Sequence, residues 1–316
     1  MAGFSVTQSA LAGFRVVREH PEAAALWVTL QVLIAIGIGL VATVTWGPDL
    51  AKLHLGAVPT AADLPRLAGL WPMFAVTGAV SLVVYSILCA AMNRAILKPR
   101  DRRFAYFRLG PEEVRQLGLT LILLAMAIAV YVAVVIVIVV VSGLFGAVTS
   151  SVSGPIGTNP NRAMAIVALG LAGMVGVFVF LGVRFSLASA QTFATGRISL
   201  FGSWVMTRGR FWPIVSTYGL ALALYGVVWL LGFTLITAVV TLVGGGAGGL
   251  AAMVNPDLGS LRAFFSPPQF TLLVMRAALS GLLWPLLLTP PATIYLALDG
   301  RGAASRQGIG HGGGVF

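Results

Sequence analysis

Carboxylates and imidazoles carry much of the acid–base and metal chemistry of proteins, and this sequence holds few of them. The three histidines are His20, His54 and His311, and no two have the spacing of four residues that places a pair of metal ligands on one helix face. The nine acids fall between apolar segments or at their ends: Glu19, Glu22, Asp49, Asp63, Asp101, Glu112, Glu113, Asp257 and Asp299. We therefore expect no catalytic residue, no metal ligand and no cofactor, and we predict that the protein is not an enzyme.

The single cysteine, Cys89, lies inside an apolar segment with no histidine nearby in the sequence. A cysteine nucleophile needs a base beside it, so a small buried filler is the better interpretation. The middle of every apolar segment also lacks Asp and Glu. Because ion-coupled carriers commonly bind protons or cations with such groups in the membrane core, the pattern disfavours a proton- or sodium-driven carrier.

The composition is that of a membrane protein. Of the 316 residues, 58% are hydrophobic and only 9% are charged, and the mean hydropathy is +0.97. A soluble domain carries about 25% charged residues, so this chain has too few charges to cover a water-exposed surface. The net charge of +11 is concentrated between the apolar segments. We interpret it as a membrane-topology signal and expect no nucleic acid partner.

Six apolar segments are long enough to cross the hydrocarbon core, which needs about 20 residues. They cover residues 23–46, 70–93, 117–147, 163–188, 212–243 and 271–298. We predict an all-α, polytopic transmembrane domain over residues 21–300, and a disordered Gly-rich tail over 301–316. Residues 1–20 form an amphipathic interfacial segment, in which Ala10, Leu11, Phe14 and Val17 recur at helical spacing.

The Lys and Arg residues are unevenly distributed between the two sets of loops. With the N-terminus inside, fifteen of the twenty fall on the inner side, and the outer side holds Lys52, Arg66, Arg162, Arg262 and Arg276. Positive residues mark cytoplasmic loops, so both termini are expected in the cytoplasm. Only two basic residues are Lys, and Ala, Gly and Val are abundant, which is typical of a GC-rich bacterial genome. We expect a multi-pass protein of a bacterial inner membrane.

Two predicted cytoplasmic connectors combine arginines with aromatic residues. One reads LKPRDRRFAYFRLGPEEVRQL over residues 97–117, and the other follows the fourth span. Arginines meet lipid phosphates and aromatic rings anchor at the interface. The predicted contacts with lipid headgroups or a partner are Arg94, Lys98, Arg100, Arg102, Arg103, Arg108, Arg184, Arg208 and Arg210.

Local signals also predict helices at the connectors. In Gly110-Pro111-Glu112-Glu113, proline suits the first helical turn and the glutamates suit the positive end of the helix dipole. We expect the third long helix to begin there, with Glu112 reaching Arg115 or Gln116. In the second connector, Ser199 is expected to cap a short amphipathic helix that Gly209 ends.

The sixth segment contains WPLLLTPPATIY. Pro285, Pro290 and Pro291 lack an N–H donor, so the helix is expected to kink or break. The carbonyl groups released by a break need partners in the protein or in a watery cavity, which would suit a substrate pathway; a static kink is the alternative. Arg276 enters the same segment, where it either meets an anionic group or extends to the outer interface.

The second connector, RFSLASAQTFATGRISLFGSWVMTRGRFW, resembles the recurring segment of a bacterial membrane-domain family best known fused to glycerophosphodiester phosphodiesterases. Arg184, Leu187, Ser199, Ser203, Thr207 and Gly209 fit that pattern, whereas its proline and a nearby acidic residue are missing. The stretch MNRAILKPRDRRFAYFRLGPEEVRQ is similar to stand-alone uncharacterised inner-membrane proteins of alphaproteobacteria. The resemblance implies a fold and a location; it does not imply phosphodiesterase activity.

Two functions follow from these patterns. The first is a non-enzymatic scaffold or lipid-associated accessory protein, whose basic inner face binds anionic lipid, a protein partner or a second copy of the chain. The alternative is a transporter or lipid-translocating protein that uses the proline-broken sixth helix.

Overall fold

The computed structural model describes residues 4–51, 64–101, 103–153 and 160–299. All regular structure in these ranges is helical. The predicted tail at 301–316 and one predicted contact residue, Arg102, lie outside the described residues.

Six helical segments of the described chain are long and apolar enough to cross a membrane, which confirms an all-α, multi-pass membrane protein. They are α3 (Pro21–Leu50), α5 (Trp71–Leu97), α6 (Pro111–Ser153), α7 (Pro160–Phe185), α10 (Phe211–Val243) and the pair α13 (Pro267–Leu288) and α14 (Pro290–Leu298). Most observed helices begin before the predicted segments, because polar residues at helix ends are invisible to an apolar count. Helix α6, with 43 residues, is about 65 Å long.

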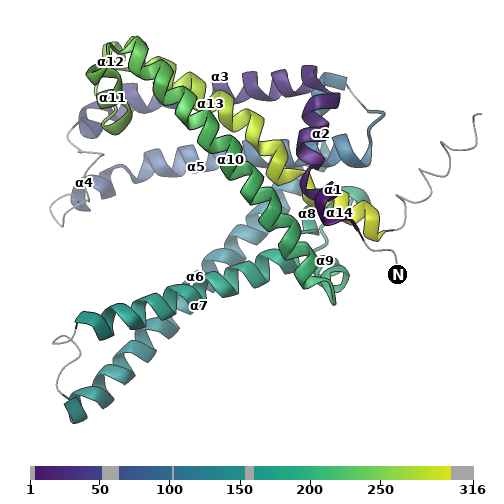
Figure 1. The fold of residues 1–316 in the computed structure, drawn as a ribbon, viewed down its shortest axis with the longest axis vertical. Helices are drawn as coiled ribbons and strands as arrows, with labels where there is room; N and C mark the ends of the chain where they lie inside the picture. Colours follow the sequence, from purple (N-terminus) through teal and green to yellow (C-terminus); the bar gives the residue numbers. More distant parts are fainter. Residues whose placement is uncertain (1–3, 52–63, 102, 154–159, 300–316) are drawn as a thin grey trace, which may run out of the picture.

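Short helices gather at the two ends of the long ones (Figure 1). One end, here called the connector end, carries α1 (Val6–Ala10), α2 (Ala12–Glu19), η2 (Arg103–Tyr106), α8 (Ala188–Thr195) and α9 (Phe201–Thr207). The opposite end, the loop end, carries α4 (Leu64–Gly69), α11 (Ala247–Val254) and α12 (Leu261–Phe264).

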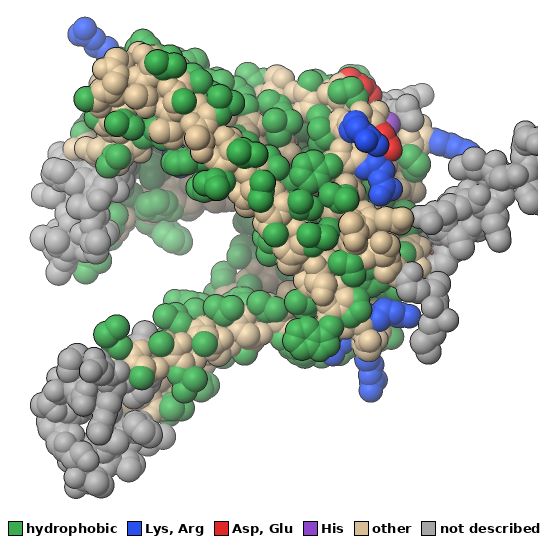
Figure 2. Space-filling model, viewed as in Figure 1, with side chains coloured by type: hydrophobic (Ala, Val, Ile, Leu, Met, Phe, Trp, Pro, Cys, Tyr) green, Lys and Arg blue, Asp and Glu red, His purple; other side chains and the backbone are tan. Residues whose placement is uncertain are grey.

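The long helices form two arms that meet near the connector end. In one arm α13 packs between α3 and α10, and the packing is close, since a Cβ on Gly281 would lie 2.8 Å from the Val28 Cα. The other arm is the α6–α7 hairpin, which diverges from the first toward the loop end (Figure 1). Figure 2 shows the opening between the arms bordered mostly by hydrophobic side chains.

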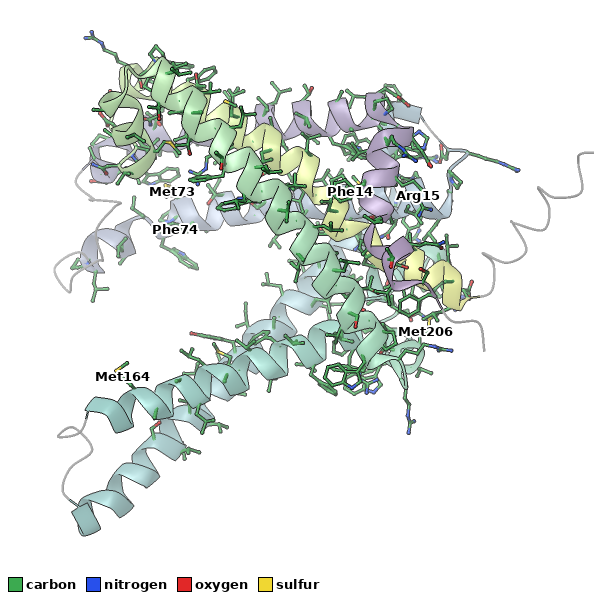
Figure 3. The ribbon with its side chains drawn as sticks, in the orientation of Figure 1. Phe14, Arg15, Met73, Phe74, Met164 and Met206 are labelled. Atoms are coloured by element: carbon green, nitrogen blue, oxygen red, sulfur yellow. The ribbon has the colours of Figure 1, made fainter. Side chains whose placement is uncertain are left out.

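The N-terminal segment is helical as predicted, in two short helices, and only part of the predicted apolar face is covered: Ala10 is buried and Val17 packs on the core. Gly13 lies against α13, where an added Cβ would be 2.6 Å from the Leu286 Cα. Ala12 and Val16 are buried beside it, whereas Leu11 and Phe14 are exposed. Phe14 and Arg15 are labelled on α2 in Figure 3. The helical spacing correctly predicted an amphipathic helix, and the close approach to α13 decides which side faces the protein.

The sixth span is divided as the prolines predict. Helix α13 ends at Leu288 and α14 begins at Pro290, while Pro285 lies inside α13 without ending it. The buried Thr289 between them donates its hydroxyl to the Pro285 carbonyl at 2.8 Å. The same carbonyl also accepts the Thr289 N–H at 3.2 Å, so Thr289 closes the last turn of α13 at the break.

Candidate functional site

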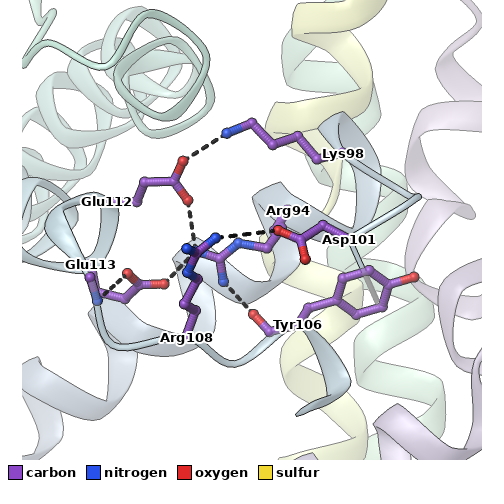
Figure 4. Close-up of polar contacts among 8 residues, drawn as sticks. Arg94, Lys98, Asp101, Tyr106, Arg108, Glu112 and Glu113 are labelled. Carbon is purple, nitrogen blue, oxygen red and sulfur yellow. Dashed lines mark hydrogen bonds and ion pairs between the residues drawn. The ribbon is translucent and has the colours of Figure 1, made fainter. Parts of the chain in front are cut away.

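The guanidinium of Arg94 is the centre of a polar network at the connector end. It lies in the last turn of α5, and its side chain is 2% exposed. Its Nη2 donates to Glu112 Oε2 at 2.7 Å and to Glu113 Oε1 at 2.5 Å, and its Nη1 donates to the Tyr106 carbonyl. Lys98 donates to the other oxygen of Glu112 at 2.7 Å (Figure 4). A buried arginine is tolerated here because two carboxylates neutralise it.

The two glutamates belong to the first turn of α6, which begins at Pro111 as predicted. Glu113 also accepts a hydrogen bond from the Gly110 N–H at 3.0 Å, as a capping residue does. The prediction that Glu112 would reach Arg115 or Gln116 is wrong, since its partners are Arg94 and Lys98. The network therefore joins the end of α5 to the start of α6 and fixes the connector between them.

The connector turn itself is strained. Phe104, Ala105 and Tyr106 have φ of 47°, 55° and 67°, and none is glycine. The left-handed region costs such residues about 1–2 kcal/mol each. Two hydrogen bonds restrain the turn: Trp27 Nε1 donates to the Ala105 carbonyl at 3.1 Å, and Arg94 donates to that of Tyr106. Strain held in this way is characteristic of functional segments.

A cavity of about 590 Å³ opens beside this turn. It is lined by Arg94, Arg100, Asp101, Phe104, Phe107 and Arg108. Arg94 Nε is buried without a hydrogen-bond partner among the described residues, and Arg108 makes only a loose, exposed contact with Asp101 at 3.8 Å. Arginines next to phenylalanine rings suit a ligand that joins an anionic group to an apolar part.

Among the described side chains, Lys98, Arg184, Arg208 and Arg210 do not line this cavity. Lys98 takes part in the network and is 49% exposed, Arg208 is exposed and Arg210 is half-buried. The backbone of Arg103 lies in η2, and its side chain is outside the described part. The guanidinium of Arg184 lies 5.2 Å from the Phe180 ring and 5.0 Å from the Trp204 ring. The structure thus brings together Arg94, Arg100 and Arg108 from the predicted set.

The second connector is held by a residue that the sequence did not single out as a cap. Ser203 Oγ donates to the Arg184 carbonyl at 2.8 Å and accepts from the Leu187 N–H at 3.1 Å, so it closes the end of α7. The predicted cap, Ser199, instead donates its N–H to Thr192 Oγ1 at 3.2 Å, and α9 begins after Leu200. Gly209 has a φ of +77° just beyond α9, in agreement with its predicted place at the helix end.

A second, larger cavity is an apolar groove of about 640 Å³ where the two arms meet. Its lining includes Leu287, Leu288 and Pro291, so the broken sixth span borders it. Pro285 and Pro290 are buried and do not line it. Arg276 is exposed on α13, nine residues after the helix begins and away from the groove.

Uncharged polar side chains meet at Ser189, which lines the groove. Ser189 Oγ accepts from Asn93 Nδ2 and from Gln116 Nε2, each at 2.8 Å. These three residues come from α5, α6 and α8. No local sequence signal predicts their meeting, because Asn93 and Gln116 are 96 and 73 positions away from Ser189 along the chain.

Within the described residues, no three His, Cys, Asp or Glu side chains come together to hold a metal ion. Comparisons of the chain with protein-family models, with curated proteins and with solved structures give no match. The resemblance to the phosphodiesterase-associated membrane domain stays a prediction, and the geometry of the two cavities carries the functional argument.

Proposed function

We propose that this protein is a non-enzymatic, lipid-associated accessory protein of a bacterial inner membrane, with both termini and the connector end in the cytoplasm. The observation that carries the proposal is the arginine- and phenylalanine-lined cavity beside the strained turn. Its expected ligand is the phosphate of an anionic lipid headgroup. A protein partner with an acidic surface, or a second copy of the chain, would engage the same face.

The surroundings of the cavity support this proposal. Lys and Arg side chains gather at the connector end in Figure 2, and the exposed ones include Arg15, Arg18, Arg100, Arg108, Arg197 and Arg208. The acids Glu112 and Glu113 are turned inward and paired, so they do not cancel this surface charge. Phe104 is 84% exposed, Phe201 78% and Trp212 74%. Such rings anchor at the level of the headgroups.

Lipid-dependent stabilisation tests the proposal. In an uncharged detergent, added anionic phospholipid should raise the Tm more than zwitterionic lipid, and salt should weaken the difference. The double substitution Arg100→Gln and Arg108→Gln should remove most of the extra stabilisation by anionic lipid, since each arginine near an anionic surface contributes about 1 kcal/mol.

The matched control is Arg262→Gln, which removes an exposed arginine from the loop end. An equal preference for anionic lipid in the unsubstituted protein, the double variant and the Arg262→Gln control would show that the cavity is not the headgroup site. The orientation is checked in a Cys89→Ala background: an impermeant maleimide added outside whole cells should label Arg262→Cys and spare Arg208→Cys.

A second candidate, lipid translocation, is favoured by one observation: the broken α13–α14 span lines the apolar groove. Broken helices beside a cavity are a recurrent feature of transporters. Liposomes containing the protein and a fluorescent phospholipid would test it. Transbilayer exchange above that of protein-free liposomes, lost in a groove-filling variant, would support translocation; exchange equal to the blank would refute it.

A further inference from the structure

We propose that the apolar groove between the α6–α7 hairpin and the other arm binds the acyl-glycerol part of one bilayer phospholipid, with its chain directed toward the loop end. This goes beyond headgroup binding, because the groove and the arginine cavity have no common lining residue. Three observations carry it: an uncharged lining, a gradient of polarity along the groove and a buried tyrosine hydroxyl at one end.

The lining comes from both arms and contains no charged residue. It includes Leu123 and Val130 on α6, Phe178 on α7, Val215 and Leu222 on α10 and Leu287 on α13. An anionic or cationic ligand would find no counter-charge here. The lining fits a hydrocarbon chain and a few uncharged oxygen atoms.

Polar and apolar residues are separated along the groove. On α7 the lining runs from Phe178, the end nearer the loops, to Ser186 just after the helix. The nine residues from Phe178 to Ser186 span about 12 Å. The polar Ser189 and Cys89 lie toward the connector end, whereas Val130 on α6 lies farther toward the loop end. The groove therefore matches an amphiphile whose polar part faces the connector end.

One hydroxyl group at the polar end is available to a ligand. Tyr218 Oη is buried near the Ser186 side chain and has no hydrogen-bond partner of good geometry among the described residues. A buried hydroxyl without such a partner is unfavourable, so a ligand that brings an acceptor oxygen here is stabilised. An ester carbonyl of the phospholipid accepts from the Tyr218 hydroxyl.

The surroundings of the groove favour a lipid chain as its occupant. The described lining carries no charge, and it offers apolar side chains from both arms. The opening toward the loop end is bordered by exposed apolar residues such as Phe74 and Met164, which point toward it from the two arms (Figure 3). At membrane depth water is excluded from such a surface, so lipid fills it.

Photo-crosslinking tests the proposal. The full chain is reconstituted into zwitterionic phosphatidylcholine vesicles containing a phosphatidylcholine with a photoreactive group midway along one chain. After irradiation, mass spectrometry maps the labelled peptides. We expect label concentrated in residues 123–130, 178–185 and 215–222, which line the groove. A zwitterionic probe keeps this test independent of the anionic-lipid proposal, because Arg100 and Arg108 are not needed for it.

Glycines provide matched variants. Gly182 on α7 and Gly219 on α10 line the groove, and a Cβ at either would meet no atom within 4 Å. Gly182→Leu and Gly219→Leu should lower groove labelling by about fivefold or more, because a side chain and a lipid chain cannot share one volume. Gly173 and Gly226 are equally unobstructed but lie outside the groove. Gly173→Leu and Gly226→Leu should therefore keep groove labelling within about twofold of the unsubstituted protein.

Three results would overturn the proposal. The first is labelling spread evenly over the lipid-facing helices and unchanged in the two groove variants. The second is equal loss in groove and control variants, with thermal unfolding showing that all four still fold. The third is crosslinking of one copy of the chain to another through the groove peptides, which would identify the occupant as a second copy.

Discussion

At the scale of single residues, Arg94 has the largest structural role that the connector end shows. It is buried, it contacts two carboxylates of α6, and it restrains the left-handed turn through the Tyr106 carbonyl. The sequence predicted a lipid contact at this position, and the structure places the guanidinium inside the protein with one edge on the cavity. Arg94 thus orders the surface on which the exposed arginines lie.

Replacing Arg94 by Gln should therefore destabilise the protein strongly. Removing one partner of a buried ion pair leaves charge unneutralised and typically costs about 3–5 kcal/mol. Thermal unfolding in detergent, followed by the loss of monodisperse protein, measures the change. Adding Glu113→Gln to Arg94→Gln should recover part of the loss, since it removes a carboxylate that would otherwise be buried alone.

Lys98→Gln is the matched control for Arg94→Gln. Lys98 shares Glu112 with Arg94 but is 49% exposed, and exposed ion pairs contribute about 1 kcal/mol or less. If both single variants had the same Tm, the network would not be the element that joins α5 to α6.

At the scale of elements, the sequence predicted those helix starts and breaks that are determined by residues close together along the chain. The start of α6 at Pro111 and the break before Pro290 were predictable, because proline and glutamate act on their own helix. The partners of Glu112 were not, since Arg94 is 18 positions away. The divergence of the α6–α7 hairpin was not predictable either: α6 is apolar on all sides, so no stripe shows which face packs.

The packing of α2 on α13 predicts that two glycine-to-alanine substitutions change the free energy of unfolding differently. Gly13→Ala should destabilise by about 1–3 kcal/mol, because its methyl group would overlap the Leu286 backbone. Gly37→Ala on α3 meets no atom within 4 Å and should be neutral or stabilise by up to about 1 kcal/mol. Unfolding temperatures of the two variants measure the difference, and a neutral Gly13→Ala would mean that α2 does not pack on α13 in solution.

At the scale of the whole molecule, the two arms touch near the connector end and separate toward the loop end. Ser86 on α5 and Thr120 on α6 are joined by a hydrogen bond of 3.3 Å, whereas Phe74 and Met164 lie on opposite sides of the opening (Figure 3). This arrangement leaves the groove accessible from the bilayer.

Disulfide trapping in membranes tests the arrangement, in a Cys89→Ala background. Ser86→Cys with Thr120→Cys should form a disulfide on mild oxidation, because those side chains are in contact. Phe74→Cys with Met164→Cys should stay reduced. Efficient crosslinking of the second pair would show that the hairpin closes onto the other arm, and the groove would then be transient.

The divergence of the hairpin also gives the molecule unequal cross-sections. Near the connector end the helices gather into one group, whereas toward the loop end the two arms lie apart (Figure 1). A membrane protein that occupies more area in one leaflet than in the other favours curvature in which the leaflet with the larger area is convex. With the proposed orientation the broad side is the outer leaflet. The protein would then concentrate where the inner membrane is convex on its outer face, and its own crowding would promote that curvature.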